Sequence, residues 1–455
     1  MEVFANRLFP VLHHLPSLES FRSFPVTHLS IATKLNCRDI FARSPNLTRV
    51  YETVVPFELI HAQERPPLRA CAIIALSSNV VSQLEDLCYI EELTWIPEND
   101  NAIYRSEVSL HRLPALKHID SYHVCVPNIL KILKLASNLS FLTLTIHSEW
   151  QYLYDLFDLL DLLPFLLVLR LFMKDISGKL AFPPSTKIVK TCVQDLRIAD
   201  YTWDARYLDR SQESLFLEFP SYFPDVNNLV LRSIYLSPNV TAYIRSLPRL
   251  WALHMRNASI PSDQNASIDS PSLQTICIDD EDEGQMQQLV SIVKCPVLSK
   301  LQLMEGDFRL MGVRLQHWDN VLMCSSIKTL DIKTLHVSQW EIHRFRVLQR
   351  LRVDSSVNEL LASFILDPGN CPVLEEVEIT TIPEWDILFL MLERRNYLPS
   401  SRGIVRIRTL ILPYPIPPDL LVPLTRILSG QFTERPSNKD LSFCGFMDAY
   451  FDPTM

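Results

Sequence analysis

Glycine is nearly absent from this sequence, with 8 residues among 455. Soluble proteins usually contain about 7% glycine. Phosphate-binding loops of dinucleotide-binding and P-loop folds need several glycines in one short stretch, whereas Gly306, Gly312 and Gly369 are scattered. This lack of glycine argues against both nucleotide-binding folds.

The sequence also lacks an excess of basic residues and a long apolar run. It carries 43 Lys and Arg against 52 Asp and Glu, a net charge of −9, so we expect no nucleic-acid partner and no membrane association. The longest apolar stretch, residues 159–172, is interrupted by Asp161, Pro164 and Arg170. The first twenty residues lack the basic start and apolar core of a signal peptide. We therefore expect a cytoplasmic or nuclear protein.

Sequence motifs for catalysis are missing as well. We find no nucleophile elbow, zinc-protease motif, EF-hand loop or P-loop, and the ten cysteines include no Cys-x-x-Cys pair. His111, His118, His123 and Cys125 lie close together, but their spacing matches no zinc finger. The acidic run at residues 279–283 is interpreted as a solvated rim loop rather than a calcium site. We therefore predict no enzyme, no cofactor and no bound metal, and we interpret the cysteines as buried thiols.

What the sequence does contain is a repeat. Apolar residues recur with the spacing of Leu163-x-x-Leu166-x-x-Leu169-x-Leu171. We call the third apolar position of each copy the marker. The markers are Leu93, Ile119, Leu142, Leu169, Leu196, Leu229, Leu253, Ile276, Leu301, Leu330, Leu351, Val377 and Leu410. Their mean step is about 26 residues, within the range of leucine-rich repeats. Fainter copies contain Phe21 and Val50, and the long steps from 196 to 229 and from 377 to 410 suggest insertions.

This period predicts an α/β leucine-rich-repeat solenoid, a horseshoe with a parallel concave sheet and helices on the convex side. The alternating end of each copy is typical of a short strand, and the segments between copies have the apolar spacing of helices. The predicted helices are Val126–Ala136, Gln151–Leu160, Ser237–Ser246, Met286–Val293, Val357–Leu366 and Trp385–Arg394. We divide the chain into an N-terminal cap with degenerate repeats (1–60), the repeat array (61–415) and a C-terminal helix, cap and tail (416–455).

Charged residues beside the inward leucines identify a candidate partner site. Because side chains alternate along a strand, residues next to an inward leucine face the concave side. The basic residues predicted there are Arg170, Arg197, Arg232, His254, Arg256, Lys300, Lys333, Arg350 and Arg352. The carboxylates are Asp195, Asp279, Asp331, Asp354, Glu376 and Glu378. One interpretation is a docking surface for an acidic partner, for which Arg197, Arg232, His254 and Arg256 must be exposed. The other is ordinary surface charge, paired across strands.

Four C-terminal segments stand out beside the repeat: Asn370–Ile379, Pro383–Asn396, Thr409–Pro413 and Phe432–Asn438. With them the chain resembles the leucine-rich-repeat region of F-box-like proteins from basidiomycete fungi, and the likeness of the repeats covers nearly the whole chain. Proteins of that family hold a target on the repeats, and an N-terminal F-box binds the Skp-type adaptor of a cullin ubiquitin ligase. The F-box itself is not evident here, since Leu15-Pro16-Ser17-Leu18 looks like the start of a repeat strand.

The resemblance therefore implies a non-catalytic protein-binding scaffold similar to the substrate-recognition part of a ligase receptor. The alternative is a regulatory repeat protein that binds and masks an enzyme or a GTPase without any ligase. Binding to the ligase adaptor is expected only if an F-box exists upstream, so this chain should not bind the adaptor.

Overall fold

A computed structural model describes the chain in separate stretches. They comprise residues 20–22, 46–54, 68–75, 89–97, 114–121, 133, 136–147, 160, 162–174, 191–200, 219–220, 222–260, 267–280, 283–304, 325–333, 342–354, 357–397, 403–412, 416–428 and 432–433. The zinc candidates His111, His123 and Cys125, and most of the predicted helices Val126–Ala136 and Gln151–Leu160, lie outside these stretches.

One parallel sheet of seventeen strands runs through the described residues. Each strand pairs in parallel with the strands that precede and follow it in the sequence. The strands are β1 (Ser20–Arg22), β2 (Arg49–Val54), β3 (Ala70–Ala75), β4 (Glu92–Pro97), β5 (His118–Ser121), β6 (Phe141–His147), β7 (Val168–Lys174), β8 (Asp195–Asp200), β9 (Asn228–Arg232), β10 (Ala252–Arg256), β11 (Thr275–Asp279), β12 (Lys300–Met304), β13 (Thr329–Lys333), β14 (Arg350–Val353), β15 (Glu376–Ile379), β16 (Thr409–Ile411) and β17 (Phe432–Thr433). This is the strand order of a solenoid.

The register of the sheet confirms the predicted repeat. Each marker pairs with the next across all twelve steps, from Leu93 and Ile119 to Val377 and Leu410. The faint N-terminal copies also align, since Phe21 pairs with Val50. The markers are buried in one continuous core together with the apolar residues two positions further on in most copies. Stacked copies thus share the apolar face that a single copy could not bury.

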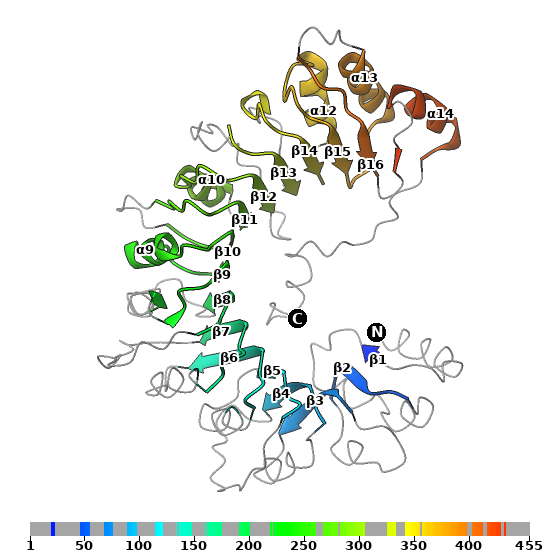
Figure 1. Cartoon of the computed structure of the whole chain (residues 1–455). Helices are drawn as coiled ribbons and strands as arrows, with labels where there is room; N and C mark the ends of the chain where they lie inside the picture. Colours follow the sequence, from blue (N-terminus) through cyan, green and yellow to red (C-terminus); the bar gives the residue numbers. More distant parts are fainter. Residues whose placement is uncertain are drawn as a thin grey trace, which may run out of the picture.

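The helices lie on the outer side of the arc that the strands line (Figure 1). They are α9 (Pro238–Ser246), α10 (Glu283–Ser291), α12 (Val357–Leu366), α13 (Trp385–Asn396) and α14 (Pro418–Ile427), with a short 3-10 helix η3 (Ile342–Arg344). Four of them match predicted helices to within three residues at either end. Ser237 caps α9, because its hydroxyl accepts from the Val240 amide. The chain is therefore an α/β leucine-rich-repeat solenoid.

Two strands escaped the sequence interpretation. In β3 the marker position holds Cys71, which pairs with Leu93, and the small residues around it weaken the apolar pattern. In β17 the marker position holds Phe432, which pairs with Leu410, although we assigned that segment only to the C-terminal tail. The long step from 377 to 410 accommodates the twelve-residue helix α13.

A buried arginine in α13 connects this helix to the loop before β15. Arg395 is almost fully buried and donates to the carbonyl oxygens of Pro368, Asn370 and Cys371, at 3.0, 2.6 and 2.5 Å. Burial lowers the pKa of Arg395 to about 10. The next residue, Asn396, accepts from the Ile407 amide at 2.9 Å. These two side chains join α13 to the loop before β15 and to the segment before β16.

Candidate partner-binding surface

The nine predicted basic residues occupy three rows of the sheet that follow the register. The first row holds the residue before each marker, the second row the residue after it, and the third row the residue three positions after it. Lys300 and Arg350 belong to the first row; Arg170, Arg197, His254 and Arg352 to the second; Arg232, Arg256 and Lys333 to the third. Each position is an odd number of residues from a buried marker, so alternation directs these side chains away from the core.

In the second row, two arginines occupy neighbouring strands. Arg170 on β7 and Arg197 on β8 are register partners, so their backbones are one strand spacing apart, about 4.8 Å. Arg197 also donates from Nε and Nη2 to the two carboxylate oxygens of Asp195, at 2.8 and 2.6 Å. This bidentate pair fixes the guanidinium on its own strand.

The third row repeats this arrangement two strands further along, on β9 and β10. Arg232 on β9 and Arg256 on β10 are register partners, and Arg256 in turn pairs with Asp279 on β11. The Nε of Arg256 lies 3.3 Å from an oxygen of Asp279. Two cations therefore lie side by side in each of two rows, all of them on β7–β10.

Two of the four residues expected to be exposed are buried. Only 3% of Arg197 and 8% of His254 is accessible, whereas Arg232 and Arg256 are half-buried. Exposure of all four residues is thus contradicted. Arg197 lies flat against Asp195, and His254 occupies the middle of β10 between Val230 and Cys277. Alternation along a strand predicts the face on which a side chain lies, but not how deeply that side chain is buried.

The acidic run after β11 also differs from the expected solvated loop. Asp279 is the last residue of β11, and both Asp279 and Asp280 are buried. The pairing with Arg256 accounts for the burial of Asp279, because a buried carboxylate needs a countercharge. Residues 281 and 282 lie outside the described residues.

Charges alternate over the C-terminal strands. Along the second row from β12 to β15, Gln302 donates to Asp331 at 3.0 Å, and Arg352 lies between two carboxylates. Its Nη1 is 3.9 Å from Asp331, and its Nε is 3.4 Å from Glu378. We call this row the C-terminal charge ladder.

Of the remaining predicted residues of this region, one has a carboxylate as its neighbour across the strands and two have neutral neighbours. In the first row, Arg350 lies 3.5 Å from Glu376. Lys300 lies between Thr275 and Thr329, and Lys333 pairs in register with Met304. Charges paired across strands therefore describe Arg350 and Arg352.

An aromatic stack adjoins the basic strands on their N-terminal side. The rings of His118 on β5 and Phe141 on β6 stack with centroids 3.7 Å apart, and the Arg170 guanidinium lies 4.5 Å from the centre of the Phe141 ring. Burial lowers the pKa of His118, against the smaller raising effects of Asp120 and Glu92. The sequence analysis missed this stack because single aromatic residues at strand starts match no motif.

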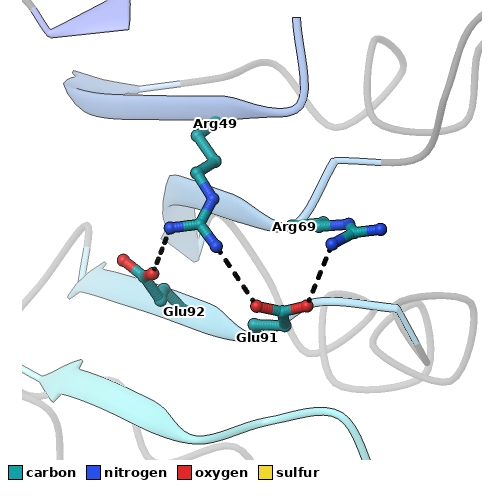
Figure 2. A network of polar contacts seen from close by, with 4 residues as sticks. All are labelled: Arg49, Arg69, Glu91 and Glu92. Carbon is teal, nitrogen blue, oxygen red and sulfur yellow. Dashed lines mark hydrogen bonds and ion pairs between the residues drawn. The ribbon is translucent and has the colours of Figure 1, made fainter. Parts of the chain in front are cut away.

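A further ion-pair network lies over β2–β4 (Figure 2). Arg49 reaches past β3 to Glu92 and Glu91, at 3.0 and 3.3 Å, and Arg69 lies 3.6 Å from Glu91. The small residue Ala70, which pairs with both Arg49 and Glu92, leaves room for this reach. The basic residues of these first strands thus have carboxylates as neighbours.

The described cysteines show two environments. Cys295 and Cys371, each six residues before a marker, are buried, in agreement with their interpretation as buried thiols. Cys324, at the same position of another repeat, lies outside the described residues. Burial raises the pKa of Cys371 to about 12. Cys277 is buried on the concave face, and Cys192 is exposed, which contradicts the interpretation of all cysteines as buried.

Neither a metal site nor a membrane span was found in the part of the chain that the structure describes. No three His, Cys, Asp or Glu side chains there are grouped closely enough to hold a metal ion. No helix within those stretches is long and apolar enough to cross a membrane.

Comparison with known proteins adds one structural likeness. No family model and no curated protein matches this sequence. A solved leucine-rich-repeat protein of Leptospira interrogans is similar, with 12% identity, coverage of 94% of this chain and 98% of that chain, and a TM-score of 0.28. The assignment of this chain as a leucine-rich-repeat solenoid rests on the register of its own strands.

Proposed function

We propose that this chain is a non-catalytic protein-binding scaffold, and that strands β7–β10 bind an acidic segment of a partner protein. The observation that carries the proposal is the placement of like charges on adjacent strands, Arg170 beside Arg197 and Arg232 beside Arg256. Like charges directly opposite each other in a sheet are destabilising. A negatively charged partner would lower that repulsion, which makes the arrangement favourable in a complex.

The two arginine pairs are close enough to act together. They occupy four consecutive strands, a width of about 14 Å at the usual strand spacing, and their rows are two residues apart. Neighbouring strands are about 4.8 Å apart, which is less than the screening length of about 8 Å at physiological salt, so the charges of neighbouring strands reinforce one another. Such a patch accelerates the association of an acidic partner more than it strengthens the final complex.

The resemblance to F-box-like proteins supports a finer proposal, in which the bound segment belongs to a ligase substrate. The alternative, a regulator that masks an enzyme or a GTPase, would use the same surface. Adaptor binding distinguishes them only if an F-box lies upstream. We expect the purified chain not to bind a Skp-type adaptor, and submicromolar affinity in calorimetry would overturn that expectation.

The test uses a fluorescent twelve-residue peptide of Asp, Glu and Ser, titrated with the full chain at low and moderate salt. Reversal of Arg256 to Glu would place a carboxylate beside the buried Asp279, so neutral variants are preferable. We expect the double variant Arg232→Gln with Arg256→Gln to bind roughly tenfold more weakly, equivalent to about 1.4 kcal/mol. Its affinity should also depend less steeply on salt.

The matched control is Arg406→Gln with Arg408→Gln, which removes the same charge from two exposed residues before β16. Thermal melting of both variants establishes that they fold. Equal weakening by the two double variants, or binding that does not respond to salt, would contradict the proposal.

A further inference from the structure

A row of side chains runs along the edge of the sheet where the strands begin. It holds the residue two positions before each marker, and we call it the entry row. Backbone hydrogen bonds of 2.9 to 3.0 Å join its successive members from β6 to β12: Ser140, Leu167, Gln194, Asn227, Trp251, Gln274 and Ser299. The row therefore follows the strands in order and forms one continuous border of the concave face.

The entry row is uncharged over the strands that carry the paired arginines. On the N-terminal side it contains Thr48, Arg69, Glu91 and Lys117, and on the C-terminal side Lys328, Gln349, Glu375 and Arg408, so each flank is mostly charged. Between them all seven members are neutral. A partner segment that contacts both the arginines and this neutral edge would carry uncharged side chains as well as carboxylates.

Large apolar side chains are exposed along this neutral part. Leu167 on the row is 43% exposed and Trp251 is 46% exposed. In the turn before Leu167, Leu162 is 52% and Phe165 is 59% exposed. Scattered exposed apolar residues are normal. Three within six residues of one turn, with a tryptophan three strands away on the same row, indicate an interaction surface because aromatic side chains contribute most to interfaces.

We infer that the partner segment is amphipathic, with bulky apolar side chains that contact the entry row around Leu167 and Trp251 and with carboxylates that contact the arginines. This inference rests on the proposed function, since it identifies the kind of acidic segment that β7–β10 bind. Trp251 and Arg256 are the two ends of one stretch of chain through β10. Five residues of strand separate them by about 16 Å, which an extended partner of about five residues spans.

The experiment compares two peptides on the full chain. One is the acidic peptide used above, and the other replaces its Ser residues by Leu and Phe. We expect the amphipathic peptide to bind at least tenfold more tightly, with an added affinity that persists at high salt because apolar contact is not screened. Equal affinity of the two peptides would overturn the inference and leave the proposed function standing.

Substitutions test whether the tighter binding of the amphipathic peptide comes from the exposed apolar residues on and beside the entry row. Phe165→Ser with Trp251→Ser should abolish the advantage of the amphipathic peptide and leave the acidic peptide unaffected. The matched control is Leu366→Ser with Tyr397→Ser, which removes two exposed apolar side chains of the convex helices. An advantage that survives the first pair of substitutions, or is lost with the control pair, would contradict the inference.

A chemical readout reports the position of the bound peptide. Cys192 is exposed and lies two residues before Gln194 of the entry row. The amphipathic peptide should slow alkylation of Cys192 by iodoacetamide, as measured by mass spectrometry, whereas the acidic peptide should slow it less. An unchanged rate would place the peptide elsewhere.

Sedimentation of the chain alone tests whether a second copy of the chain covers this edge instead of a partner. A dimer that is lost with Trp251→Ser would mean that it does.

Discussion

The central strands β7–β10 and the C-terminal strands β12–β15 share one architecture and differ in the order of their charges. Both have buried markers in register and basic residues in the same rows. Over the central strands, arginine neighbours arginine, whereas in the C-terminal charge ladder Arg352 lies between Asp331 and Glu378. A repeat can therefore keep its core constant while the order of charges across its strands changes.

The electrostatic consequence differs between the two regions. In the C-terminal charge ladder the countercharges are already supplied by the neighbouring strands, so an incoming acidic partner would compete with Asp331 and Glu378. In the central strands Arg197 and Arg256 also have carboxylate partners, Asp195 and Asp279. Each of them nevertheless lies beside a second arginine, so a partner's carboxylates would lower the repulsion between neighbours. Substitutions in the core, substitutions of charged residues and changes of pH test this comparison between the two regions.

The largest effect should come from the core, and it should be alike in both regions. Leu196 on β8 and Leu330 on β13 are fully buried at equivalent positions. We expect Leu196→Ala and Leu330→Ala each to lower the free energy of unfolding by about 2–5 kcal/mol through the cavity they leave. Leu301→Ala and Leu351→Ala should behave in the same way. Urea denaturation measures the loss.

Hydrogen exchange tests how the damage spreads. In a solenoid each repeat contacts mainly its neighbours. Exchange should therefore rise first in the strands adjoining the substituted one. A uniform rise along the whole chain would show that the two regions are not separable units.

Substitution of a single arginine should have an intermediate effect on stability, and the effect should differ between the two regions. Arg352→Gln removes the cation beside the buried Asp331. We expect it to cost about 1–2 kcal/mol, as when a buried carboxylate loses a charged partner. Arg232→Gln should change stability by less than about 0.5 kcal/mol, because it also removes a repulsive neighbour of Arg256. Chemical denaturation of the two variants in parallel provides the measurement, and equal losses would contradict the contrast between the regions.

The smallest effect concerns pH and the aromatic stack beside the central strands. Burial lowers the pKa of His118 below 6.5, its ordinary value. The unfolded chain therefore binds a proton more readily than the folded chain does, so the contribution of His118 to stability is complete above pH 6.5 and falls as the pH is lowered. His118→Phe keeps a ring against Phe141 without titrating. Unfolding at pH 7.5 and 5.5 should show a smaller pH dependence for this variant than for the parent chain.

Much of the fold could be predicted from the sequence, because the repeat is a local pattern. The marker spacing correctly predicted twelve consecutive strand pairings, and the apolar periodicity predicted α12 with both ends correct. β3 was missed because Cys71 and its small neighbours do not produce a clear apolar period. The burial of Arg395 was also missed, since an Arg-Arg pair at a helix end looks like exposed charge near the helix dipole.

The candidate surface was predictable only in part. Alternation along the strands predicts that the nine basic residues point away from the core. Which of them are neighbours depends on the register between copies separated by 21 to 33 residues. Burial depends on what lies beside each side chain, which made Arg197 and His254 inaccessible although their positions in the repeat equal that of Arg170.

By itself, the sequence determined that this chain is a solenoid and which side chains point into its core, because a short apolar period can be satisfied only by stacking equivalent copies. Only the tertiary structure decided which charges meet and that the neutral entry row borders the paired arginines. Those relations arise between strands that are distant in the sequence and lie about 4.8 Å apart in the sheet. At that spacing the neighbour across the strands, rather than the neighbour along the chain, sets the environment of a side chain.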